Sequence, residues 1–385
     1  MAPLQPGTVG ILPPGALGVG LFYHLTRELT AVDGRVFFLE RRGSRSGQAL
    51  RESGALQILT PEGRRSLPTD NLLYPDLLDS FALGHLPEVV LVCPNPDQIL
   101  PFITTSVQLL EKLHEADSLL PGAQDFPHLV LCANGIYFQR FRQIFIEKIE
   151  EATLFGRLPD LWPHTMPAIV SRFLRGVTIQ TGVRDGNGAD TLYRPGPKGL
   201  TQIAGGDAAT RLRCCQILQE LGGWFEAVGD RSATRLEFDK ALVNLACNLL
   251  GQIYAIDDTG SFQVLTVGEI AAPSRHAQMR ELAHHVFQVG RTVRAYAPQE
   301  KFEDICDRLL ATCRAHADHV PSSLQWVSLS IQQGTLKPEI TPTEAWLLEP
   351  LLRYARASEL PESVAYFESL KQTLVERLAR LVGHA

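Results

Sequence analysis

Short apolar runs alternate with helix-length segments through the first half of the chain. Four runs are long enough for a buried strand, at Thr8–Leu12, Val36–Leu39, Val89–Cys93 and Leu129–Cys132. Strands that are covered on both faces read as continuous apolar runs, and helices connect them when they are parallel. The pattern therefore predicts a parallel, helix-covered sheet. Further strands are expected at Gly176–Thr181, Thr201–Ala204 and Phe225–Val228.

Helical periodicity dominates from about Asp207 onward. The expected helices are Ala208–Leu221, Glu237–Leu250, His276–Val289, Pro298–Ala317, Ser322–Gln333, Glu344–Ala357 and Pro361–Leu381. Pro and Gly cluster at Tyr193–Gly199 and again at Ala204–Gly206, which favours a domain boundary there. We expect a sheet domain over residues 1–206, with an insertion at about 144–171, and an all-helical domain over residues 207–385.

One predicted helix carries polar residues at every fourth position of an apolar run. Lys240, Asn244 and Asn248 lie on one stripe of this helix, and apolar residues separate them. Such a stripe most often faces water. Two Asn inside a helix are unfavourable, however, and Lys is rarely buried without a partner. The alternative is a polar cleft that faces these three side chains.

The composition of the chain argues against nucleic-acid binding, a metal site and a membrane span. The 385 residues are 45% hydrophobic with a formal net charge of -6, and no basic block indicates nucleic-acid binding. The seven Cys form no CxxC pair, His284-His285 cannot share a helix face as metal ligands, and no apolar run is long enough to span a membrane. We expect a reduced, soluble, cytoplasmic protein without a metal site.

The first strand is followed by a glycine turn of the dinucleotide-binding type. Gly15 and Gly18 occupy the second and third positions of the GxGxxG fingerprint, with Ala16 and Leu17 between them, and Pro13 stands at the first. Proline has a fixed φ and no N–H group. The turn by itself is equally compatible with a phosphate cradle and a purely structural turn.

The end of the second strand bears on the choice of cofactor. Glu40 there could accept a hydrogen bond from a ribose 2′-hydroxyl, whereas Arg41 and Arg42 could bind a 2′-phosphate. The arginines favour NADP and leave NAD open. A solvated basic turn would look the same.

Several motifs in order resemble the ketopantoate reductases (2-dehydropantoate 2-reductases) along nearly the whole chain. They are the Gly15–Gly18 turn, Cys132-Ala-Asn134-Gly135, Arg175-Gly-Val-Thr-Ile with Tyr193-Arg-Pro-Gly-Pro, the helix Phe238–Asn248, and Pro321-Ser-Ser323-Leu-Gln with Pro338-Glu339-Ile340. The resemblance implies a Rossmann-type domain, a helical domain like that of 6-phosphogluconate dehydrogenase, and a ketone substrate bound between them. The pathway that the resemblance implies is pantothenate biosynthesis, but the departures described below favour a divergent member that is not a standard enzyme of that pathway.

The same resemblance implies roles for individual residues. Lys240 would be the general acid that protonates the alkoxide after hydride transfer from a nicotinamide, which agrees with the chemistry of an ammonium beside a developing oxyanion. Asn244, Asn248 and Ser323 would bind the substrate. Glu339 would contact a substrate hydroxyl or orient the lysine, and Asn134 would lie near nicotinamide and substrate. Alternatively, Ser323 could cap its helix and Glu339 could be a solvated loop residue.

Three departures indicate a divergent member of that family. Asn95 stands where the family commonly has lysine, extra residues separate Ser323 from Glu339, and the 144–171 segment is long enough to be a lid. The default substrate is a ketopantoate-like 2-keto acid. The rivals are a non-catalytic descendant that binds a dinucleotide or metabolite, and an opine or hydroxy-acid dehydrogenase. A homodimer and a monomer are both left open.

Overall fold

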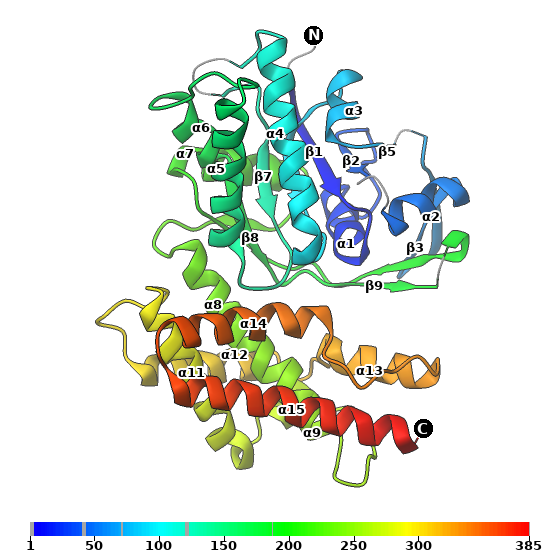
Figure 1. The fold of residues 1–385 in the computed structure, drawn as a ribbon. Coiled ribbons are helices and arrows are strands. Elements are labelled where there is room, and N and C mark those ends of the chain that lie inside the picture. Colours follow the sequence, from blue (N-terminus) through cyan, green and yellow to red (C-terminus); the bar gives the residue numbers. More distant parts are fainter. Residues whose placement is uncertain (1–3, 41–43, 71, 120–122, 187, 385) are drawn as a thin grey trace. The chain divides into compact units, whose positions relative to one another are not determined.

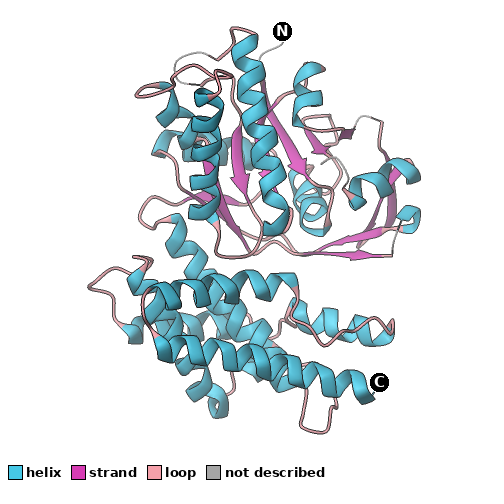
Figure 2. Cartoon of the chain, in the orientation of Figure 1, coloured by secondary structure: helices cyan, strands magenta, loops and turns pink. Residues whose placement is uncertain are grey.

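The chain folds into two compact units. The computed structural model describes residues 4–40, 44–70, 72–119, 123–186 and 188–384. Unit 1 comprises Met1–Ala133 and Phe138–Ala233, and unit 2 comprises Asn134–Tyr137 and Thr234–Ala385. Figure 2 shows that the strands belong to unit 1, whereas unit 2 is helical. Within the described residues, no helix is long and apolar enough to cross a membrane.

Unit 1 is organised around an eight-stranded sheet of Rossmann type. Its strand order is β12-β11-β8-β7-β6-β1-β2-β5, and every neighbouring pair is parallel except β11 with β8. The central strands are fully buried apolar runs, as expected for a sheet that is covered on both faces. The bounds are β1 (Gln5–Leu12), β2 (Val36–Leu39), β5 (Leu73–Tyr74), β6 (Pro87–Val92), β7 (His128–Leu131), β8 (Phe173–Thr178), β11 (Thr201–Ala204) and β12 (Phe225–Ala227).

Helices cover both faces of this sheet. On one face, α1 (Ala16–Leu25) and α7 (Ala208–Glu220) pack their apolar side chains against β1, β2 and β6. The helices α4 (Ile99–Glu115) and α5 (Phe138–Leu154) lie side by side in Figure 1. The remaining helices of unit 1 are α2 (Arg45–Ser53), α3 (Leu77–Ala82), α6 (Thr165–Ser171) and the short 3-10 turns η1 (Pro96–Gln98) and η2 (Gly188–Asp190).

Two expectations about unit 1 differ from the structure. The boundary expected after residue 206 falls too early, because α7 packs on the main sheet and β12 pairs with β11. The expected insertion at 144–171 is not one long loop, because α5 extends through Leu154 and α6 occupies the last seven residues, Thr165–Ser171. Buried Phe145 and Ile149 join the α5 part of this segment to the body of the unit.

A second, four-stranded sheet was not expected from the sequence. Its order is β4-β3-β10-β9, formed by β3 (Ala55–Thr60), β4 (Gly63–Pro68), β9 (Gly182–Asp185) and β10 (Leu192–Pro195). Polar and exposed residues dominate β4, so no apolar run marks it in the sequence. The β9 backbone lies against the start of α1, because a Cβ on Gly182 would be 2.4 Å from the carbonyl oxygen of Ala16.

Unit 2 is a helical bundle around one large apolar core. Its helices are α8 (Ala233–Asn244), η3 (Leu245–Leu249), α9 (Leu250–Ala255), α10 (Val267–Ile270), η4 (Pro273–Arg275), α11 (His276–Thr292), α12 (Phe302–Ala315), α13 (Ser322–Gln332), α14 (Pro342–Ala357) and α15 (Pro361–His384). The expected helix at Glu237–Leu250 is present but interrupted, because η3 is a π-helical turn. The segments α8, η3 and α9 follow one another directly and form one rod. Core side chains from α11, α12, α14 and α15 pack around this rod.

Candidate functional site

The glycine turn in unit 1 combines a tight packing position with an open one. A Cβ on Gly18 would lie 2.4 Å from the carbonyl oxygen of Pro13, so only glycine fits there. At Gly15, the N-cap of α1, no described atom lies within 4 Å of the corresponding position. The first-turn amides of Ala16, Leu17 and Gly18 precede the first helical hydrogen bond, from Val19 N to Gly15 O. The turn thus has the open space and the amide donors that an anion needs.

Pro13 is accommodated in the turn that glycine usually makes. Its bond to Leu12 is cis, and its carbonyl oxygen accepts a hydrogen bond of 2.7 Å from the Gly15 amide. The Tyr193 hydroxyl of β10 donates to the carbonyl oxygen of Pro14 at 2.8 Å. The second sheet therefore supports the turn directly.

Arg184 is a cation near this turn that sequence reasoning missed. It is paired across the β9–β10 hairpin with Tyr193, the residue that holds Pro14. Burial raises the pKa of the Tyr193 phenol, and the charge of Arg184 opposes that shift. Arg184 Nε is buried and has no hydrogen-bond partner among the described residues. Only the hairpin register brings this arginine near the turn, so no sequence spacing could have indicated it.

Glu40 at the end of β2 is already engaged within unit 1. Its carboxylate is buried, lies 2.6 Å from Arg51 Nη1, and fills the space where a Gly47 side chain would be. Burial raises the pKa of Glu40 and the charge of Arg51 opposes the rise. Arg41 and Arg42 lie outside the described residues, so the preference for NADP stays a prediction.

Lys240 lies on α8 as a half-buried cation. Among the described residues, no carboxylate is within ion-pair distance of its ammonium. The neighbouring Asp239 instead pairs with Arg235 at 2.7 Å, and Arg235 also pairs with Glu300. Burial lowers the pKa of Lys240, and Cys247 partly offsets this shift. A structural salt bridge, which would have argued against a chemical role, is therefore not formed.

The polar stripe that begins at Lys240 leads through the π turn to Ser323. Asn244 is buried at the end of α8, and Asn248 follows in η3. The Ser323 hydroxyl lies 3.1 Å from Asn248 Oδ1 and 3.3 Å from its main-chain oxygen. Ser323 therefore bonds to Asn248 and does not cap α13, whose N-cap is Pro321. Two of the expected substrate-binding residues are in direct contact.

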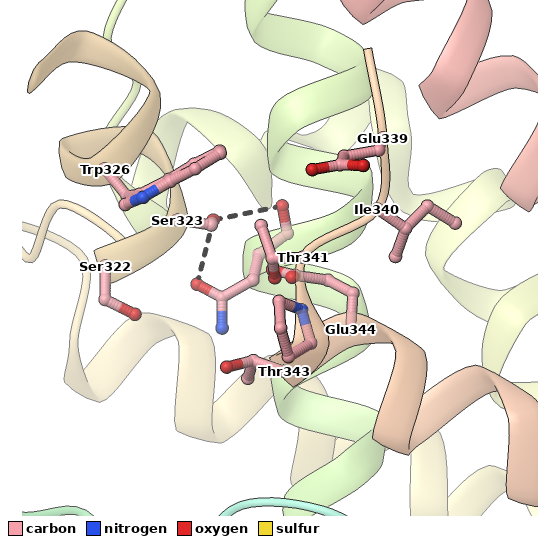
Figure 3. A pocket seen from close by; sticks show the side chains of 10 residues that line it. Ser322, Ser323, Trp326, Glu339, Ile340, Thr341, Thr343 and Glu344 are labelled. Carbon is pink, nitrogen blue, oxygen red and sulfur yellow. Dashed lines mark hydrogen bonds between the residues drawn. The ribbon is translucent and has the colours of Figure 1, made fainter. Parts of the chain in front are cut away.

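Asn248 and Ser323 line a pocket of about 310 Å³ (Figure 3). Ser322, Trp326, Glu339, Ile340, Thr341, Pro342, Thr343 and Glu344 complete its wall. Glu339 is solvent-exposed but borders the pocket, so the extra residues after Ser323 have not removed it. Among the described residues, Lys240, Asn244 and Asn134 are not part of the wall.

Glu344 is the buried carboxyl of this pocket, and sequence reasoning missed it. Its side chain is 2% exposed, Oε1 accepts a hydrogen bond of 3.3 Å from Gln252, and Oε2 has no partner among the described residues. Burial raises the pKa of Glu344 to about 7. The one signal in the sequence is Thr341-Pro-Thr-Glu344, which has the pattern of a helix start. That pattern predicts a cap and says nothing of a pocket.

Asn134 lies in the four-residue segment that belongs to unit 2. Gly135 has a φ of +131°, and the Ile136 amide donates to the Trp346 carbonyl oxygen at 3.1 Å. The Tyr137 amide donates to Glu237 at 3.2 Å. Asn134 itself is exposed. This segment is thus fixed to α8 and α14 by its backbone.

Comparison with known proteins identifies the fold. No family model and no curated protein sequence matches the chain. Among solved structures, D-mandelate dehydrogenase in complex with NADH is similar, with 14% identity and a TM-score of 0.63 over 97% of this chain and 99% of that one. The probable 2-dehydropantoate 2-reductase from Bacillus subtilis has 16% identity and a TM-score of 0.57 over 96% and 99%. A dimeric ketopantoate reductase from Staphylococcus aureus has 14% identity and a TM-score of 0.53 over 95% and 99%. The chain therefore has the fold that ketopantoate reductases and D-mandelate dehydrogenase share, as the sequence motifs predicted.

Proposed function

We propose that this protein is a nicotinamide-dinucleotide-dependent oxidoreductase that reduces a small 2-keto acid to the 2-hydroxy acid. The observation that carries the proposal is Lys240, a half-buried cation with no carboxylate partner among the described residues, on the rod that leads to the Asn248–Ser323 pocket. The fold supports it as well. D-mandelate dehydrogenase, which has this fold, has been solved with NADH and anilino(oxo)acetate.

The glycine turn of unit 1 fits the phosphates of a dinucleotide. The open space at Gly15 and the first-turn amides suit an anion, and the buried Nε of Arg184 offers a donor that has no partner within the described part of the chain. We therefore assign phosphate binding to the amides of Ala16, Leu17 and Gly18, with Arg184 beside them. The proposal keeps NADP ahead of NAD because of Arg41 and Arg42.

Unit 2 supplies the proton and the substrate-binding groups in this proposal. When bound, a reduced nicotinamide supplies hydride to the keto carbon. Lys240 stabilises the negative charge that develops on the keto oxygen and donates the proton to that oxygen. Asn244, Asn248 and Ser323 orient the substrate through hydrogen bonds, and Asn134 is assigned to the same task. Glu344 is added to the expected Glu339 as a pocket carboxyl.

Titration of the purified protein with NADPH and NADH tests the proposal. Binding is followed by fluorescence and by thermal shift, and turnover is followed with a panel of 2-keto acids. We expect Gly15→Trp to lose dinucleotide binding because the indole fills the open space. Lys240→Ala should keep that binding and lose roughly 100- to 10,000-fold in kcat. Lys301→Ala, on an exposed part of the same unit, is the control and should retain both.

A wild-type protein that binds neither dinucleotide would contradict the oxidoreductase proposal. A protein that binds a dinucleotide but reduces no keto acid, with Lys240→Ala indistinguishable from wild type, would instead support a non-catalytic binding role.

A further inference from the structure

The pocket beside Asn248 has an acidic and aromatic wall. Glu339 and Glu344 contribute carboxyl groups, and Trp326 contributes an indole that is 40% exposed (Figure 3). Among the described residues, none of the side chains that line this pocket is basic. The wall thus attracts positive charge and offers it no protein partner.

Glu344 is the residue that most needs a partner from outside the protein. A buried carboxylate is costly unless hydrogen bonds or opposite charge compensate it. Gln252 donates one hydrogen bond of 3.3 Å to Oε1, while Oε2 has no partner among the described residues. Glu344 lines the pocket, so a positively charged ligand there can balance its charge.

The chemistry of the wall selects the class of ligand. The described part of the chain contains no cluster of three or more side chains of the types that hold a metal ion. A ligand hydroxyl would donate one hydrogen bond but would leave the negative charge of the wall unbalanced. An ammonium or guanidinium group donates several hydrogen bonds, balances the carboxylates and interacts favourably with an indole face.

The position of the pocket along the rod indicates which end of the substrate it would hold. Asn248, in the pocket wall, follows Lys240 by eight positions, which corresponds to about 12 Å along a regular helix. If Lys240 acts at the keto oxygen, a substrate that also reaches the pocket must extend along the rod. The pocket is suited to the far end of the same substrate.

We propose that this pocket binds a cationic group at the far end of the substrate, so that the reductase acts on 2-oxo acids with an ammonium or guanidinium tail. The inference rests on the proposed function for the identity of the reacting end. The cation pocket itself does not depend on catalysis, so the two can fail separately.

Calorimetric titration with three probes tests the pocket. The probes are 5-guanidino-2-oxopentanoate, uncharged 2-oxohexanoate and butylguanidinium, which lacks the oxo acid. We expect the guanidino oxo acid to bind at least tenfold more tightly than 2-oxohexanoate, and butylguanidinium to compete with it. Equal affinity for the charged and uncharged oxo acids, or no competition by butylguanidinium, would overturn the cation pocket.

Matched variants locate the binding. Glu344→Gln keeps the size of the side chain and should lose at least tenfold in affinity for both guanidinium probes. Glu349→Gln on the exposed side of the same helix is the control and should behave as wild type. An unchanged affinity of Glu344→Gln for butylguanidinium would contradict the assignment of the site.

The pH dependence of butylguanidinium affinity distinguishes a Glu344 that binds the cation from one with a purely structural role. Guanidinium stays protonated, so titration must come from the protein. Among the neighbours of Glu344, Glu339 also lines the pocket. Asn248 of η3, Gln252 of α9 and Ser323 of α13 do not titrate. The raised pKa of Glu344 comes from burial, and no charge from α11 or α15 contributes to it. Affinity for butylguanidinium should rise as Glu344 ionises near pH 7, and this rise should disappear in Glu344→Gln. Tighter binding of butylguanidinium at acidic pH would show that Glu344 acts as a protonated hydrogen-bond donor, and it would overturn the proposal.

Turnover separates this inference from the proposed function. Faster reduction of 5-guanidino-2-oxopentanoate than of 2-oxohexanoate supports both. Reduction of 2-oxohexanoate without guanidinium binding overturns the pocket and leaves the reductase. Guanidinium binding without reduction of any keto acid overturns the reductase and leaves the pocket.

Discussion

Lys240 shows at the scale of one residue how burial can prepare an acid for catalysis. Removing an ammonium from water without an anionic partner disfavours its charged form, and burial accordingly lowers the pKa of Lys240 from its ordinary value of 10.5. A lower pKa brings the ammonium closer to the pH at which proton donation is efficient. Asp239 does not cancel this effect, because it pairs with Arg235.

Lys240 should therefore impose a pH limit on reduction. The acid must be protonated to donate, so kcat should fall as pH rises through the lowered pKa of Lys240. Lys240→Arg retains the positive charge but releases no proton at these pH values. We expect it to lose at least a hundredfold in kcat and to lose this limb of the pH profile. A wild-type kcat that stays constant up to pH 10.5 would contradict the role of Lys240 as acid.

Glu344 should make the stability of the protein depend on pH. Its folded pKa of about 7 exceeds the ordinary 4.5, so the native state binds more protons than the unfolded state between these values. The contribution of Glu344 to the free energy of unfolding is fully present below pH 4.5 and is lost as pH rises through 7. The full effect is about 3 kcal/mol.

Removing the charge at position 344 should reverse that loss. Urea unfolding of Glu344→Gln is expected to show higher stability than wild type at pH 8.5 by up to about 3 kcal/mol, with the difference shrinking toward pH 5. Glu349→Gln provides the comparison on an exposed position of the same helix. A variant that is less stable than wild type at pH 8.5 would mean that Glu344 is ionised and well compensated.

The π turn η3 is the element that sets the direction of Asn248. A π turn arises where a helix contains one more residue than regular hydrogen bonding accommodates, and such turns occur often at functional sites. Regular spacing would continue the Lys240 stripe straight through Asn248. The turn instead changes the helical phase between Asn244 and Asn248, where the side chain meets Ser323.

Deleting Ala246 should convert η3 into regular helix and change the orientation of Asn248 relative to Asn244. We expect the deletion to lose at least tenfold in affinity for the keto-acid substrate, while dinucleotide binding persists. Cys247→Ala keeps the register and serves as control. Native-like substrate affinity in the deletion variant would show that the π turn does not position Asn248.

The glycine turn permits a paired experiment on one element. Gly18→Ala places a Cβ against the Pro13 carbonyl oxygen and should lower stability by about 1–3 kcal/mol. Gly15→Ala meets no described atom and has an ordinary φ of -93°, so it should fold normally. If the open space holds phosphate, Gly15→Ala should still weaken dinucleotide binding at least tenfold. Unchanged binding in Gly15→Ala would reduce the turn to a structural feature.

At the scale of the whole molecule, the chain crosses from unit 1 to unit 2 and returns within four residues. Arg175 of β8 is almost fully buried and donates to the carbonyl oxygens of Leu131 and Ala133 at 2.6 and 2.8 Å. These bonds hold the backbone immediately before Asn134. Ile136 then inserts into the apolar core of unit 2.

Ile136→Ala should consequently destabilise unit 2, even though the chain before Asn134 and after Tyr137 belongs to unit 1. Loss of a fully buried aliphatic side chain typically costs about 2–5 kcal/mol. We expect native-state hydrogen exchange to accelerate in α11 and α14 while the amides of β6 and β7 keep their protection. Ile253→Ala, whose side chain is only partly buried against the same core, is the milder comparison. Equal acceleration in both units would show that they unfold as one cooperative body.

The sequence by itself determined the elements whose signal is local. Buried parallel strands need continuous apolar runs, so β1, β2, β6 and β7 were predicted close to their observed bounds. Amphipathic periodicity predicted the main helices of unit 2. The contact between Asn248 and Ser323 joins two residues whose types and order follow a recognisable motif, and their substrate-binding role stays a prediction.

Only the tertiary structure decided the features that depend on distant neighbours. The second sheet escaped notice because β4 and β9 are largely polar and a glutamine interrupts the apolar residues of β3, so no continuous apolar run marks the sheet. The expected boundary after residue 206 ignored the pairing of β12 with β11, which periodicity cannot reveal. Glu344 looked like the start of a helix, but packing around Gln252 and Asn248 made it a buried carboxyl. Burial and electrostatic environment arise from residues far apart in the chain, and for that reason the chemistry of this pocket emerged only with the fold.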